Sequence, residues 1–94
     1  MVINNKEINL KITPTALRKT EEMFENFDIL KLLREVQDNN KEPRMTDYYK
    51  LVYTGYLGGT EEEINYEDFL KLIEEVDMLE INRVGVDLLL KRKN

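Results

Sequence analysis

The stretch that decides the fold runs from Asp47 to Leu57 and reads DYYKLVYTGYL. At 100° per residue its apolar side chains cover about two thirds of a helical wheel. A helix with so wide an apolar surface needs neighbours on several sides, so we expect it to be the central element. Thr46 is the expected N-cap, Gly55 predicts a close helix crossing, and Gly58-Gly59 predicts the end of the helix.

Four of the five tyrosines of the chain lie in this stretch. Tyrosine combines a large apolar ring with a hydroxyl group that needs water or another partner. One interpretation is a core helix whose tyrosine hydroxyls reach the surface. The other is a docking face for a partner protein, and its candidate residues are Tyr49, Tyr53 and Tyr56.

The composition indicates an ordinary globular chain. With 94 residues, 41% hydrophobic and 35% charged, it predicts a single domain over residues 1–94. The net charge of −5 argues against binding to DNA or RNA, which depends on neutralising phosphates. No apolar run approaches the roughly 20 residues of a membrane span, and no secretory signal is recognisable. We therefore expect a cytoplasmic protein that binds neither nucleic acid nor membranes.

The N-terminal twelve residues predict a small β-hairpin. Asn4-Asn5-Lys6 supplies turn chemistry, and Ile8 to Ile12 alternates apolar and polar residues with the period of a half-buried strand. Thr13-Pro14 then predicts a helix start, with threonine as N-cap and proline at the first helical position. Residues 13–94 are expected to form a helical bundle.

Four to five short helices are expected in this bundle, so the predicted fold class is mainly α with a small β-hairpin. The first carries an apolar stripe of Ala16, Leu17, Thr20, Met23, Phe24 and Phe27. Asp28 is the expected N-cap of the second, whose apolar side is Ile29, Leu30, Leu32, Leu33 and Val36. Residues 38–43 form a polar loop, and Tyr66 to Val76 predicts a further amphipathic helix.

The last segment, residues 78–94, has two opposed apolar stripes if it is helical. One consists of Leu79, Val86 and Leu90, and the other of Ile81, Val84 and Leu88. A terminal helix in so small a domain does not usually bury both. Either one stripe is half-exposed aliphatic surface, or it is a docking site for another helix or subunit. A homo-oligomer is therefore one of the expected arrangements.

Catalytic and metal-binding patterns are missing from the sequence. There is no cysteine and no histidine. The run from Ile64 to Phe69 resembles the exit of a calcium-binding loop, but with Glu67 at its twelfth position the required carboxylates and the central glycine are absent. The paired acids lack a base or nucleophile beside them. We expect no enzyme activity, no cofactor and no metal.

The N-terminal pattern VINNKEINLKITPTALRKTEEM resembles the opening of tail assembly chaperones from long-tailed phages and prophages of Gram-positive bacteria. That family typically begins with a short apolar segment, an INGK turn, an alternating strand and an ALRKLE helix. Asn4-Asn5-Lys6, Ile8 to Ile12 and Ala16-Leu17-Arg18-Lys19 occupy those places here. The remainder is similar in layout. Asn5 stands where glycine is usual, and Thr13-Pro14 replaces an aromatic link.

The resemblance implies a non-enzymatic protein that binds the tape measure protein and keeps it soluble in the host cytoplasm during tail assembly. It also implies absence from the finished tail and a contact with the tail tube protein in longer frameshifted forms. Two other classes stay open. One is a small helical regulatory module with one defined protein partner, and the other is a structural tail or head-completion protein present in purified particles.

Overall fold

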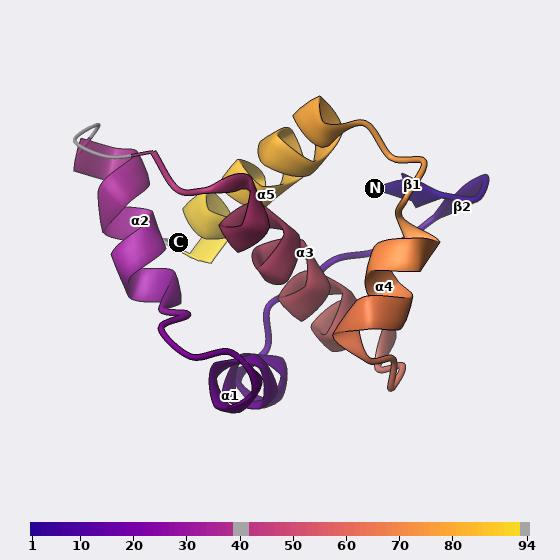
Figure 1. The fold of residues 1–94 in the computed structure, drawn as a ribbon, viewed down its shortest axis with the longest axis horizontal. Coiled ribbons are helices and arrows are strands. Elements are labelled where there is room, and N and C mark those ends of the chain that lie inside the picture. The colour runs from indigo at the N-terminus through magenta and orange to yellow at the C-terminus, as the bar shows by residue number, and fades with distance from the viewer. Residues whose placement is uncertain (39–41, 93–94) are drawn as a thin grey trace.

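The computed structural model describes residues 1–38 and 42–92, and within them the chain forms a two-stranded hairpin and five helices (Figure 1). The strands are β1 (Val2–Ile3) and β2 (Lys6–Glu7), and the helices are α1 (Pro14–Met23), α2 (Ile29–Asp38), α3 (Met45–Thr60), α4 (Tyr66–Leu72) and α5 (Met78–Arg92). The predicted class, mainly α with a small N-terminal hairpin, is confirmed.

Helix α3 is the central element, as expected. It runs through the middle of the molecule with α1 and α4 around it, and it packs most extensively against α5 (Figure 1). Leu51, Val52 and Thr54 are completely buried within it. Helix α2 packs against α5. The stretch that is apolar on most sides is therefore also the one that is contacted on most sides.

The ends of α3 differ from the prediction. Thr46 is not the N-cap but lies in the first turn, because the helix begins at Met45. Asp47 stabilises that end instead, since its carboxylate accepts a hydrogen bond from the backbone N–H of Arg44 at 3.1 Å. At the other end the helix does not stop at Gly58-Gly59 but continues to Thr60, and Glu61 ends it in the left-handed conformation, with φ of 59°.

The glycines of α3 serve close packing rather than helix termination. The N-terminal extended segment lies directly on them, and the backbone N–H of Lys11 donates to the carbonyl oxygen of Gly55 at 2.9 Å. A Cβ atom at Gly58 would meet the carbonyl oxygen of Lys11, and one at Gly59 would meet that of Asn9. Only glycine lets the backbone of this segment approach the helix so closely.

The hairpin is shorter than predicted. Asn4 and Asn5 form its turn with φ values of 52° and 64°, as their tolerance of the left-handed region led us to expect. Its strands pair Val2 with Glu7 and Ile3 with Lys6. The expected strand from Ile8 to Ile12 is not paired in a sheet, because its backbone lies on α3. Its alternation is nevertheless real, with the three apolar residues half-buried and the polar residues between them exposed.

Helix α1 begins where predicted and ends earlier. The Thr13 hydroxyl accepts a hydrogen bond from the N–H of Ala16 at 3.1 Å, which confirms the N-cap. The helix stops at Met23, and Asn26 turns the chain with φ of 63°. The prediction of a helical stripe that reaches Phe27 is therefore wrong. Met23 is exposed, and Phe27 enters the core from the irregular segment that follows the turn.

Helix α2 begins after Asp28, whose carboxylate accepts from the N–H of Lys31 at 3.2 Å and confirms the predicted cap. Ile29 and Leu32 are buried, but Leu30, expected on the same apolar side, is 58% exposed. The predicted polar loop over 38–43 lies partly outside the described residues.

Helix α4 begins after Asn65, whose side chain accepts from the N–H of Asp68 at 2.8 Å. It ends at Leu72, and not near Val76 as predicted. The chain turns there and completely buries Ile73.

The crossing of α3 and α5 uses a glycine on each helix. At Gly55 a Cβ atom would lie 3.0 Å from the Leu88 Cδ1 atom of α5, so the predicted close crossing is confirmed. At Gly85 a Cβ atom would lie 2.6 Å from the Tyr48 Cδ1 atom of α3. At each glycine, the space that a side chain would fill is occupied by a side chain of the other helix. Among the described helices, none is long and apolar enough to cross a membrane.

Candidate partner-binding surface

The two apolar stripes of α5 face opposite environments. Ile81 is completely buried, and Val84 and Leu88 are nearly so. On the opposite side Leu79 is 79% exposed and Leu90 is 43% exposed. Because the stripe of Ile81, Val84 and Leu88 packs in the core, its residues are not available to a partner. Of the two stripes, only the outward one, with Leu79 and Leu90, remains as a candidate surface.

The outward stripe forms an apolar strip along one side of the molecule. Leu79 and Leu90 are eleven residues apart, which is about three helical turns, so their side chains leave α5 in nearly the same direction. Val86 lies beside them and is half-buried. Met78, at the first position of α5, is also exposed, but it lies about 100° around the helix from Leu79 and so beside the strip. Sequence reasoning did not single out Met78, although its position next to Leu79 was visible.

Charged residues lie between the two leucines of this strip. Arg83 lies one turn after Glu80 and one turn before Asp87. Its Nε atom donates to Glu80 Oε2 at 3.3 Å, and its Nη1 atom donates to Asp87 Oδ2 at 3.3 Å. The hydrogen bonds from Arg83 hold the pKa of the Glu80 carboxyl below its usual value. Such exposed ion pairs add little to stability, so they order the face rather than hold the fold together.

The tyrosine face of α3 points into the molecule. Tyr53 and Tyr56 are buried, and their hydroxyl groups hold the link between α3 and α4. The Tyr53 hydroxyl donates to the carbonyl oxygen of Ile64 at 2.6 Å, and the Tyr56 hydroxyl donates to Glu62 Oε2 at 2.6 Å. Tyr49 is half-buried. The core interpretation therefore accounts for Tyr53 and Tyr56, and their hydroxyls reach protein acceptors.

These tyrosines belong to an aromatic cluster that joins α1, α3 and α4. Tyr53 lies 5.3 Å from Tyr66 and 5.2 Å from Phe69 between ring centroids, and Phe24 lies 4.8 Å from Tyr66. Burial, and then the bond to Glu62, raises the pKa of Tyr56 to about 12. Burial, and then the charge of Glu67, raises the pKa of Tyr66 to about 12. The phenols therefore stay neutral at physiological pH and support packing.

The concave regions of the surface are shallow and carry no catalytic arrangement. A groove of about 330 Å³ between α1 and the end of α3 is lined by Lys19 and by Glu61 to Glu63. In the described ranges, 1–38 and 42–92, no three acidic residues are placed to hold a metal ion. Nor does any buried side-chain nitrogen or oxygen there lack a hydrogen-bond partner. These regions supply no unsatisfied group that would point to a ligand.

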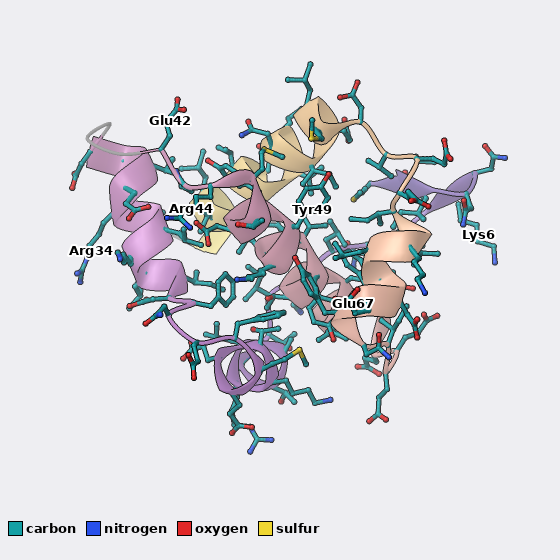
Figure 2. All side chains as sticks on the ribbon, viewed as in Figure 1. Lys6, Arg34, Glu42, Arg44, Tyr49 and Glu67 are labelled. Atoms are coloured by element: carbon teal, nitrogen blue, oxygen red, sulfur yellow. The ribbon has the colours of Figure 1, made fainter. Side chains whose placement is uncertain are left out.

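Charged side chains surround the outside of the molecule. Lys6, Arg34 and Glu42 extend into solvent at its periphery in Figure 2. Among the residues whose burial the structure describes, the exposed large apolar side chains are those of Val2, Met23, Leu30, Met78, Leu79 and Leu90. Leu79 is the most exposed of them, and three of the six belong to α5. The outward face of α5 is therefore the strongest candidate for a partner.

Comparison with known proteins identifies no relative: no family model, no curated protein and no solved structure matches the chain.

Proposed function

We propose that this protein is a non-enzymatic phage tail assembly chaperone that binds the tape measure protein and keeps it soluble in the host cytoplasm. The observation that carries the proposal is the exposure of Leu79 and Leu90 on one side of α5. The resemblance of the N-terminal segment to that family supports it. In this role the protein is absent from the finished tail, and the tail tube protein is a second partner.

The chemistry of the face suits an amphipathic helical client. A helix laid along α5 would cover Leu79, Val86 and Leu90 with its own apolar side chains. Removing this area from water favours binding by about 25 cal/mol per Å² before the costs of association. The net charge of −5 favours the solubility of a protein with such a face.

Co-expression with the tape measure protein tests the proposal. We expect that partner to become soluble and to co-purify with the unchanged chain. Leu79→Ser combined with Leu90→Ser should abolish co-purification, because it removes the two exposed leucines of the outward stripe without touching the core. Leu30→Ser is the matched control, since Leu30 is an exposed leucine on α2.

Three outcomes contradict the proposal. The first is a partner that stays insoluble, and the second is co-purification that survives the double substitution. The third is recovery of this chain in purified particles, which favours a structural tail or head-completion protein. Capture of a different single partner without any effect on solubility favours a regulatory module.

A further inference from the structure

When the outward face of α5 is read in the reverse direction, its leucines coincide with one another and its basic and acidic residues change places. Read from its N-terminal end the exposed positions are Leu79, Arg83, Asp87 and Leu90, and they fall within about 80° of the helical wheel. An apolar residue stands at each end and opposite charges stand between. A face of this kind is complementary to itself when the helix is turned end for end.

We propose that α5 pairs with α5 of a second copy of this chain in an antiparallel dimer. In this arrangement Leu79 contacts Leu90 of the second copy, and Arg83 faces Asp87 of the second copy. Both contacts are symmetric about the same point of the sequence, near Gly85, to within about half a residue. Because the dimer has two-fold symmetry, each contact occurs twice. No other register places both the leucines and the opposite charges in contact.

Charge complementarity selects this occupant and this direction. A parallel pair in register would place Arg83 against Arg83 and Asp87 against Asp87, which is unfavourable. In the antiparallel pair, Arg83 exchanges the carboxylate of Asp87 in its own helix for that of Asp87 in the second copy. Its present bonds to Glu80 and Asp87 lie on a solvent-exposed surface, so this exchange costs little.

The length of the helix sets the strength of the pair. Fifteen residues span about 22 Å, and one helix face of that length buries less than a standard protein interface. We therefore expect a reversible dimer that forms as concentration rises. Because the pair covers Leu79 and Leu90, it excludes a client from the same face, and this last consequence rests on the proposed function.

Single-cysteine variants test the pairing directly, because the natural chain contains no cysteine. A tagged Leu79→Cys protein is mixed with an untagged Leu90→Cys protein and oxidised without a client. We expect the mixed disulfide to form several-fold faster than either homodimer, since only the antiparallel pair places the two positions together. Leu30→Cys on α2 gives the rate for random collision. In sedimentation experiments the natural chain should move from monomer to dimer with concentration.

The proposed pairing requires that the mixed disulfide forms faster than the disulfide of the Leu30→Cys control. Faster Leu79→Cys homodimers, mixed dimers no faster than Leu30→Cys, or a monomer at every concentration up to about 1 mM each overturn it. The experiment contains no tape measure protein, so its failure leaves the co-expression result untouched, and failure of co-expression leaves the disulfide result untouched.

An exchange of the charges at positions 83 and 87 distinguishes specific pairing from non-specific hydrophobic association. Asp87→Arg should raise the dimer dissociation constant by about tenfold, because arginine then faces arginine in both symmetric contacts. Adding Arg83→Asp should restore the natural value, since opposite charges face each other again. Both side chains are more than half exposed, so circular dichroism should show an unchanged fold. A dimer indifferent to both changes overturns the proposed register.

Discussion

Gly59 illustrates how one residue can be required for its lack of a side chain. In an isolated helix alanine would be favoured over glycine by about 1 kcal/mol. In this protein a Cβ atom at Gly59 meets the backbone carbonyl of Asn9, which cannot rotate away as a side chain can. The segment that lies on α3 would have to move, and with it the half-buried Leu10.

We predict that Gly59→Ala lowers the free energy of unfolding by about 1 to 3 kcal/mol, the usual cost of forcing atoms into a filled space. Gly55→Ala is the matched control, because its nearest neighbour is the end of the flexible Leu88 side chain at 3.0 Å. It should cost clearly less. Urea unfolding of both variants measures the difference, and equal effects would contradict this account of the glycines.

Helix α5 has one side that holds the fold and one that does not. Ile81 is completely buried in the core, whereas Leu79, two residues earlier, is mostly in water. Truncating a buried isoleucine removes apolar contacts and leaves a cavity. Truncating an exposed leucine changes little, because that side chain is already solvated.

We therefore predict that Ile81→Ala lowers the free energy of unfolding by about 2 to 5 kcal/mol, and that Leu79→Ala changes it by less than about 0.5 kcal/mol. Thermal unfolding followed by circular dichroism measures both. A large loss at Leu79 would mean that it packs within the monomer and would remove it from the proposed binding face.

The aromatic cluster links the stability of the entire protein to pH. An unfolded tyrosine loses its proton near pH 10, while Tyr56 and Tyr66 in the folded protein keep theirs to about 12. Between these values the unfolded state binds fewer protons, so rising pH favours unfolding. The contribution of both groups is complete below pH 10 and is lost as pH approaches 12.

We predict that urea unfolding midpoints fall steeply above pH 10, and that Tyr56→Phe makes this fall shallower. At pH 7 the same variant should lose about 1 kcal/mol, because the hydrogen bond to Glu62 is removed. Tyrosinate absorbance should appear together with unfolding. If the urea midpoint of Tyr56→Phe fell with pH as steeply as that of the natural chain, this phenol would not couple folding to pH.

Local sequence signals predicted local structure well. Thr13-Pro14 and Asp28 mark helix starts, because a side-chain oxygen can satisfy a free backbone N–H whatever surrounds it. Asn4-Asn5 marks a turn because asparagine tolerates positive φ. The wide apolar surface of α3 identified the centre of the fold. Each of these depends on a few neighbouring residues, so the sequence is sufficient.

The remaining features depend on contacts between distant segments. Gly58-Gly59 has the pattern of a helix end, and only the segment that lies on it shows why the helix continues. The two stripes of α5 are equally apolar, and the packing of α3 and α2 decides that Ile81, Val84 and Leu88 are core while Leu79 and Leu90 face solvent. Burial is a property of the assembled chain, because a side chain is removed from water only by whatever packs over it.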